Sequence, residues 1–348
     1  MLSVNKLRSC ASNSESSEYI ILKHNLENTM IKNTCSNAIR LMKRICIVAV
    51  LSSSLTLSAA EPSAYSDSVP TPSFTDVSYG THSRNVLDFW QAESSVPTPL
   101  VFVVHGGGWN GGQKEIVDRF VDVQRLLDAG ISVAAINYRL IKHANAENIT
   151  PPVKAPLYDA ARALQFLRSK ADEWNIDKEH IAAAGGSAGA CTSLWLLYHD
   201  DLADPDSSDP IARESTRLYC AAVRRAQTSL DPKQMTEWIP EVTYGEHAFG
   251  IASFDEFLLK RDSILPIINE YSPYALASVD DPAVYLYYTV VPGTGKTRGD
   301  FVHSGGFGVG LKAHCAELGI PCELYYKGVE NPNYTSTTDY LLAKLKGI

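Results

Sequence analysis

Residues 185–189 read Gly-Gly-Ser-Ala-Gly and directly follow the apolar run at residues 180–184, His-Ile-Ala-Ala-Ala. This is the G-x-S-x-G pattern, in which a serine lies on a sharp, strained turn between a strand and a helix. Small residues are needed around such a turn, because a larger side chain would collide with the neighbouring backbone. The stretch therefore predicts a strand before Ser187, a helix after it and an exposed serine hydroxyl between them.

A second glycine-rich stretch lies earlier in the chain, where residues 105–109 read His-Gly-Gly-Gly-Trp after the apolar run 99–104. Glycines leave backbone N–H groups uncovered, so that these groups can point at a negative charge that develops during a reaction. A tight structural turn is the alternative. Because each stretch ends an apolar run and the two occur in this order, together they predict a serine nucleophile and an oxyanion hole.

Apolar runs and helical patterns alternate along residues 74–345, which is typical of a mostly parallel sheet that helices cover on both faces. The rhythm breaks at residues 231–274, where aromatic side chains among charges predict an irregular inserted lid over the active-site edge of the sheet. Strands are expected at residues 74–79, 85–91, 100–104, 131–138, 181–184, 219–227, 283–290 and 322–326, and helices at residues 114–129, 158–174, 190–198, 307–318 and 335–345.

The first 60 residues predict a targeting segment. A basic start at Met42, an apolar stretch at residues 45–57 and small residues before Ala60 are the parts of a secretory signal peptide. The apolar stretch is shorter than the roughly 20 residues that span a bilayer, so no stable membrane span is expected. We expect cleavage near Ala60 and a secreted or periplasmic protein, with residues 1–41 as a mispredicted extension; a long N-terminal region or a membrane anchor is the alternative.

Composition and charge predict a soluble globular domain at residues 74–348, preceded by a Pro- and Ser-rich linker at residues 61–73. The chain has 348 residues, 45% of them hydrophobic and 20% charged, and a net charge of −8. Without a basic run to neutralise phosphates, a nucleic-acid partner is not expected, and a small molecule or an uncharged polymer is the more natural substrate. The cysteines after residue 60 lack the spacing of a metal site, and neither a metal nor an organic cofactor is expected. Cys315 and Cys322 flank a turn and form either a disulfide or buried free thiols.

With these two motifs and this order of strands and helices, residues 74–348 resemble the α/β-hydrolase fold. They are most similar to the carboxylesterases with an HGGGW loop, near the hormone-sensitive-lipase and feruloyl- or acetyl-esterase branches. The resemblance implies that Ser187 attacks a carbonyl carbon and forms an acyl-enzyme. It also implies that the backbone N–H groups of Gly107, Gly108 and Ala188 bind the tetrahedral oxyanion.

Two residues beside these glycines also receive roles from the resemblance. His105 would shape the loop rather than transfer protons. Trp109 would either form the floor of the acyl pocket or pack in the core.

The acid of a catalytic triad is expected after the strand at residues 283–290. Asp300 follows that strand and matches the acid-containing turn of the resembled family, with residues 291–298 as an insertion. Asp231, at the end of the preceding strand, is the alternative. For both, an ordinary surface aspartate is the other alternative.

The catalytic histidine is missing from the place that the resemblance implies. That place is the loop after the last strand, which reads Gly-Val-Glu-Asn-Pro-Asn at residues 328–333, and no histidine follows His314. Asn331 stands where the base is expected, and an asparagine amide cannot accept the proton of a serine hydroxyl. Either another histidine replaces it, with His303 in the loop of Asp300 as the first choice and His247 in the insertion as the second, or the protein does not turn its ligand over.

We therefore expect a serine hydrolase of the carboxylesterase type that acts on small acyl or carbohydrate-linked esters. A catalytically impaired protein that binds an ester or a glycan is the first alternative. A serine peptidase of the same fold is the second, although the chain contains no repeat that would form the propeller domain such peptidases carry.

Overall fold

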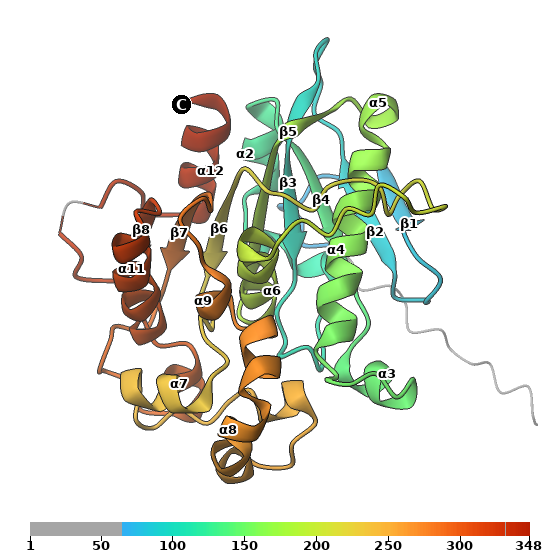
Figure 1. Ribbon diagram of the computed structural model, residues 1–348. Helices are drawn as coiled ribbons and strands as arrows, with labels where there is room; N and C mark the ends of the chain where they lie inside the picture. Colours follow the sequence, from blue (N-terminus) through green and yellow to red (C-terminus); the bar gives the residue numbers. More distant parts are fainter. Residues whose placement is uncertain (1–64, 331) are drawn as a thin grey trace, which may run out of the picture. The chain divides into compact units, whose positions relative to one another are not determined.

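The computed structural model describes residues 65–330 and 332–348, which are built around one sheet (Figure 1). Its strands are β1 (Phe74–Ser78), β2 (Val86–Trp90), β3 (Thr98–Val104), β4 (Ser132–Ile136), β5 (Ile176–Gly186), β6 (Cys220–Arg224), β7 (Ala283–Tyr287) and β8 (Cys322–Tyr325). Their order across the sheet is β1-β2-β4-β3-β5-β6-β7-β8. β2 is antiparallel to β1 and β4, and the neighbours from β4 onward are parallel. The carboxyl ends of β3 to β8 therefore meet at one edge, as the sequence predicted.

Helices lie on both faces of this sheet and at its carboxyl edge (Figure 1). They are η1 (Lys114–Arg119), α2 (Val123–Asp128), α3 (Ile141–Ala146), α4 (Lys154–Ser169), α5 (Ala171–Trp174), α6 (Ala188–Tyr198), α7 (Pro232–Trp238), η2 (Glu246–Phe249), α8 (Phe254–Tyr271), α9 (Pro273–Leu276), α10 (Arg298–Val302), α11 (Gly306–Leu318) and α12 (Thr337–Lys346).

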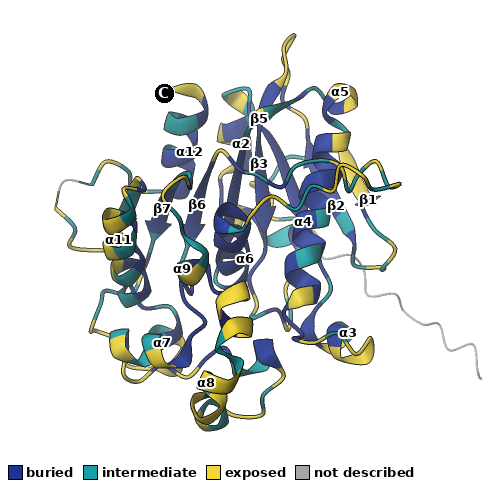
Figure 2. Cartoon of the chain, viewed as in Figure 1, coloured by how far each residue is buried: buried dark blue, intermediate teal, exposed yellow. Residues whose placement is uncertain are grey.

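The central strands are apolar along their whole length because helices cover both of their faces. Every residue of β3 and β4 is buried (Figure 2). Phe102 and Val104 of β3 belong to the core that α4 and α6 share, whereas Val101 and Val103 pack with α2 and α12. This alternation follows from strand geometry, in which successive side chains point to opposite faces.

The helix expected at residues 114–129 is in fact two helices, η1 and α2. The backbone of Ile116 departs from helical geometry, with φ −93° and ψ 24°. Asp122 then begins α2 by accepting a hydrogen bond from the N–H of Arg125. Aspartate is favoured at the start of a helix and disfavoured inside one, so Asp122 separates the two segments.

The insertion at residues 231–274 is more regular than the sequence predicted, because it contains α7, η2 and α8. Ser253 caps α8 by accepting a hydrogen bond from the N–H of Glu256, and α8 buries Phe257 and Ile268. Pro266 lies inside α8, where a proline normally interrupts a helical pattern. This proline, together with the charges around the aromatic residues, concealed the helix in the sequence.

The predicted signal peptide and N-terminal extension lie outside the described residues. Of the expected linker, Tyr65 contacts Trp90 edge to face at 5.3 Å, and the indole N–H of Trp90 donates to the carbonyl of Pro70 at 2.7 Å. In the part of the chain that the structure describes, no helix is long and apolar enough to cross a bilayer. Cys315 and Cys322 are free thiols.

Candidate active site

A cavity of about 1030 Å³ opens at the carboxyl edge of the parallel strands. Both glycine-rich motifs line it, together with the segments that follow β6 and β7, the start of α10 and residues 244–247 of the insertion. A concave pocket at this edge is where sheets of this type bind their ligands. Three residues of the insertion, Tyr244, Glu246 and His247, thus border the site.

Ser187 lies on the turn between β5 and α6, with φ 54° and ψ −125°. Its N–H donates to the carbonyl of Arg224 at 2.9 Å, which fixes the turn to the end of β6. A Cβ atom on Gly189 would lie only 2.1 Å from the carbonyl oxygen of Val104 on β3. The turn therefore packs against the backbone of the neighbouring strand, and this close approach explains why the motif needs glycine.

The second glycine motif follows β3 and lies against the serine turn. A Cβ atom on Gly106 would lie 2.5 Å from the carbonyl oxygen of Gly186. Gly107 and Gly108 have positive φ values of 110° and 61° and line the cavity beside Ser187. Within residues 65–330 and 332–348, the N–H groups of Gly107, Gly108 and Ala188 donate no hydrogen bond to a protein acceptor. These three groups are thus available to an oxyanion, and that role stays a prediction.

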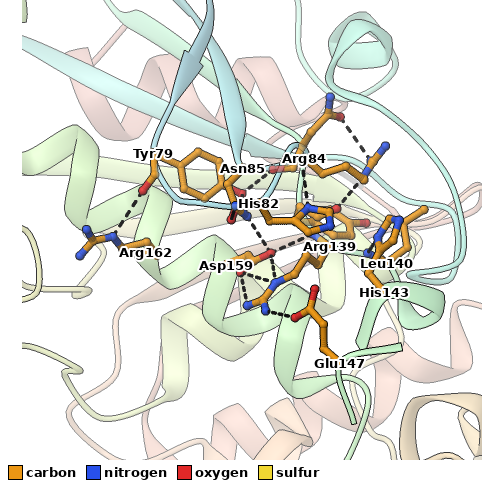
Figure 3. Close-up of polar contacts among 12 residues, drawn as sticks. Tyr79, His82, Arg84, Asn85, Arg139, Leu140, His143, Glu147, Asp159 and Arg162 are labelled. Carbon is orange, nitrogen blue, oxygen red and sulfur yellow. Dashed lines mark hydrogen bonds and ion pairs between the residues drawn. The ribbon is translucent and has the colours of Figure 1, made fainter. Parts of the chain in front are cut away.

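A polar network around Arg84 supports this glycine loop. Arg84 donates from Nε to the carbonyl of Tyr138 at 2.7 Å and from Nη2 to the carbonyl of Gly112 at 2.9 Å. Beside it, the half-buried Arg139 forms an ion pair with the buried carboxylate of Asp159 at 2.6 Å (Figure 3). The network joins the segment after β4 to the loop after β3, so that the loop is held before any ligand arrives.

His105 has a structural place in this loop. Its ring is buried and stacks on Tyr138 at a centroid distance of 4.2 Å, and its Nδ1 lies 2.8 Å from the carbonyl oxygen of Gly106. Burial lowers the pKa of His105 to about 3, although the Gly106 carbonyl opposes that shift. A neutral, enclosed imidazole agrees with the role of shaping the loop.

His303 is the histidine that the structure brings to Ser187. Its Nε2 lies 2.9 Å from the Ser187 Oγ, and its Nδ1 lies 2.8 Å from the carbonyl oxygen of Gly299. A neutral ring with its proton on Nδ1 donates to Gly299 and keeps Nε2 free to accept from the serine hydroxyl. This contact is the one that a general base needs.

Arg225 adds a positive charge on the other side of the same ring. Its Nη2 lies 3.0 Å from His303 Nδ1, and its own backbone has φ 56°, an uncommon value for a residue with a side chain. Burial, and after it Arg225, lowers the pKa of His303 to about 4, while the carbonyl of Gly299 and the charge of Asp300 act in the opposite direction. His303 is therefore neutral, and able to accept a proton, down to mildly acidic pH.

The structure does not place Asp300 as the partner of His303, which corrects the prediction of a triad acid at this position. Its Oδ2 accepts from the N–H groups of Lys296 and Thr297, each at 3.1 Å. These hydrogen bonds, that of Lys296 first, lower the pKa of the carboxyl. Asp300 is occupied in capping the start of α10, and the Gly299 carbonyl takes the place at Nδ1 that a carboxylate would have.

Asp231, the alternative acid, is also engaged elsewhere. It begins α7 by accepting from the N–H of Lys233, and it binds Arg261 through both carboxylate oxygens, with Nε at 3.0 Å from Oδ1 and Nη2 at 2.5 Å from Oδ2. It does not line the cavity.

The expectation that Trp109 forms the pocket floor is also corrected. The side chain is fully buried outside the cavity lining, and its indole N–H donates to the hydroxyl of Thr192 at 3.0 Å. Trp109 therefore packs in the core, the alternative that the sequence had left open. Tyr244 and His247 line the cavity, and their ring centroids lie 6.3 Å and 6.1 Å from that of Trp109.

His247, the second candidate base, faces the glycine loop instead of the serine. Its Nε2 lies 3.0 Å from the carbonyl oxygen of Gly108, which ties the insertion to the oxyanion loop. Burial lowers its pKa. Asn331, which stands at the expected position of the base, lies outside the described residues.

Sequence reasoning missed the arginines of the cavity. Arg119, Arg224, Arg225 and Arg298 all line it. A signal existed for two of them, because Arg224 and Arg225 directly follow the apolar residues 220–223 within the strand predicted at residues 219–227, and so fall near the edge where the other motifs meet.

The comparisons with known proteins agree with this architecture. Residues 87–223 match the family model described as BD-FAE. The chain is 34% identical over 134 residues to kynurenine formamidase of Debaryomyces hansenii, a match that covers 37% of this chain and 41% of that protein. It is 32% identical over 131 residues to the probable carboxylic ester hydrolase LipM of Mycobacterium tuberculosis, covering 36% of this chain and 28% of that protein. The chain thus spans less than half the length of the curated relatives it matches.

Among solved structures, the acetyl ester-xyloside bifunctional hydrolase from Caldicellulosiruptor lactoaceticus is similar with a TM-score of 0.51 and 24% sequence identity. This similarity covers 69% of this chain and 77% of that one, and it supports the fold. Together with the strand order, the serine turn and the glycine loop described above, this similarity identifies the α/β-hydrolase fold in this chain.

Proposed function

We propose that this protein is a serine hydrolase that cleaves carboxylic esters through an acyl-enzyme. The observation that carries the proposal is the 2.9 Å contact between Ser187 Oγ and His303 Nε2 at the wall of the cavity. A serine hydroxyl is a weak nucleophile until an adjacent base accepts its proton. His303 supplies that base. In the sequence it was the first choice to replace the histidine that is missing after the last strand.

The reaction follows from the positions of these groups. His303 takes the proton from Ser187 while Oγ attacks the ester carbonyl, and the N–H groups of Gly107, Gly108 and Ala188 bind the oxygen that becomes negative. The imidazolium then gives its proton to the departing alcohol, and a water molecule releases the acyl group by the same steps. In the reactive tautomer, Nδ1 donates to the Gly299 carbonyl, which leaves Nε2 free to accept the serine proton.

Small acyl or carbohydrate-linked esters are the proposed substrates. The names of similar proteins, a carboxylic ester hydrolase and an acetyl ester-xyloside hydrolase, support this class. The open cavity at the sheet edge has room for a ligand of that size. We also propose a secreted or periplasmic location on the basis of residues 42–60, which sequencing the N-terminus of the mature protein would test.

The test compares the wild-type protein with Ser187→Ala and His303→Ala. We expect hydrolysis of p-nitrophenyl acetate and butyrate and labelling by a fluorophosphonate, with Ser187→Ala lowering kcat by at least about 10³-fold and abolishing the label. His303→Ala should lower kcat by about 10²-fold or more. If the wild-type protein neither hydrolyses these esters nor takes the label at any pH, the ester- or glycan-binding alternative replaces the hydrolase.

A further inference from the structure

The cavity carries an excess of positive charge that ester hydrolysis does not explain. Four arginines line it, Arg119, Arg224, Arg225 and Arg298, and Glu246 is the only carboxylate residue of the described lining. The whole chain has a net charge of −8, so the charge of the cavity lining is opposite in sign to the net charge of the protein. A cleft lined by charges of one sign concentrates the field and attracts ligands of the other sign.

Three of these guanidinium groups have no carboxylate within ion-pair distance in the described residues. Arg224 donates to the backbone carbonyl of Arg119 at 2.8 Å and lies over the ring of Tyr287 at 4.8 Å, so neutral groups hold it in place. Arg225 contacts His303. Arg298 lies 3.8 Å from Glu246 and also donates to the carbonyl of Thr243. The carboxylate of Asp300 acts on Arg225 from beyond ion-pair distance, in the direction that raises its pKa.

The backbone fixes these side chains at the rim. Arg119 ends η1, Arg224 ends β6 and Arg225 follows with its positive φ value. Burial, and after it the charge of Arg224, lowers the pKa of Arg225. Adjacent like charges in a partly buried site cost stability, and such local conflicts in a fold are typical of functional sites.

We propose that Arg119, Arg224 and Arg225, here called the arginine cluster, bind a negatively charged group on the substrate. The preferred esters would therefore carry a second, anionic substituent besides the ester that Ser187 attacks. This inference rests on the proposed ester hydrolysis at Ser187 and narrows its substrate class. The planar guanidinium fork of arginine matches an oxyanion such as a carboxylate or a sulfonate through two parallel N–H donors.

The position of Arg225 connects this binding to the reaction. An Arg225 N–H that donates to His303 Nδ1 favours the ring with its proton on Nε2, which cannot accept from Ser187. An anion that takes up the donors of Arg225 leaves Nδ1 to donate to the Gly299 carbonyl, as the reactive tautomer requires. An anionic ester should thus gain in kcat as well as in KM.

The test uses three esters of one size that differ in charge: p-acetoxybenzoate, p-acetoxybenzenesulfonate and the neutral methyl p-acetoxybenzoate. At low ionic strength we expect at least one anionic ester to exceed the neutral one in kcat/KM by about tenfold, because a hydrogen bond to a charged group is worth about that factor. Added salt should reduce the preference, since half-exposed charges are screened. The two anionic esters distinguish a planar carboxylate from a tetrahedral sulfonate.

Variants then locate the effect. Arg119→Gln and Arg224→Gln should each lower the anionic-to-neutral ratio of kcat/KM by about fivefold to tenfold. Arg213→Gln is the matched control, because this exposed arginine does not line the cavity, and it should leave the ratio unchanged. An equal or lower kcat/KM for both anionic esters, or a ratio that the two cavity variants do not alter, would overturn the proposal.

A binding measurement separates this proposal from the proposed function. In Ser187→Ala, calorimetry should detect tighter binding of an anionic ester than of the neutral one, by about tenfold and dependent on Arg224. That result would support the arginine cluster even if the wild-type protein hydrolysed no ester. Equal binding of the three esters would refute the cluster even if hydrolysis of neutral esters were fast.

Discussion

Replacing Arg225 by methionine should shift the pH dependence of the reaction. In the wild-type protein the pKa of His303 is about 4, and Arg225 is the second cause after burial. Two unit charges about 4 Å apart interact by about 1 kcal/mol in water and about 4 kcal/mol near a protein surface. Because Arg225 is exposed to solvent, we take the lower part of that range, about 1 to 2 kcal/mol. One pH unit corresponds to about 1.4 kcal/mol, so the pKa of His303 should rise to about 5.

The assay is the pH profile of kcat/KM for p-nitrophenyl acetate, a neutral ester that leaves the arginine cluster unoccupied. Activity requires the unprotonated ring, so it falls as the pH drops through the pKa of His303. The acid limb should lie near pH 4 in the wild-type protein and near pH 5 in Arg225→Met. NMR titration of the His303 ring provides a reading that does not depend on turnover.

Arg119→Gln is the control for this shift. It removes another arginine of the cavity, but Arg119 is not among the groups that move the pKa of His303. Its acid limb should therefore coincide with that of the wild-type protein. The reasoning is refuted if the wild-type limb lies near the ordinary histidine pKa of about 6.5, or if Arg225→Met leaves the limb in place.

Three further predictions follow from the site and its scaffold. Asp300→Asn should lower kcat less than about tenfold, far less than His303→Ala, because the carboxylate caps α10 instead of contacting the ring; equal losses would restore Asp300 as the triad acid. Gly189→Ala should lower the melting temperature strongly, because its Cβ would lie 2.1 Å from a strand carbonyl, whereas Gly111→Ala meets no atom within 4 Å and should be tolerated. Below pH 6.5 the unfolded chain binds a proton at His105 that the folded protein, with a pKa of about 3 for this residue, does not bind. The free energy of unfolding should therefore fall by about 3 kcal/mol by pH 4.5. Urea unfolding of the wild type and of His105→Gln at about pH 6.5 and about pH 4.5 checks this, and a difference in free energy between the two proteins that does not change with pH would contradict it.

The sequence predicted the framework well because its signals are local. An unbroken apolar run defines β3, and glycines that no side chain could replace define the turn at Ser187. The same reasoning named His303 as the first choice for the base and His247 as the second, because the contact joins residues 116 positions apart and no local signal decides between them.

The remaining errors concern side chains whose partners the sequence does not reveal. Asp300 follows the expected strand, but the choice between a helix cap and a histidine partner depends on the path of a few residues. Trp109 follows the glycines, and only packing decides whether its ring faces the core or the cavity. The arginine cluster is formed by residues of η1 and β6 and by the residue that follows β6, so no single stretch of sequence predicts it.

His303, between β7 and α11, separates two parts of the chain. The residues up to His303 supply the cavity lining, and those after it support the sheet. Among the described residues that line the cavity, none follows His303 in sequence. Under the proposed mechanism, the catalytic base does not come from β8, from α12 or from the loop between them. What the described part of that loop contributes is support for the sheet, since the carbonyl of Tyr334 accepts from the hydroxyl of Tyr285 on β7 at 3.0 Å.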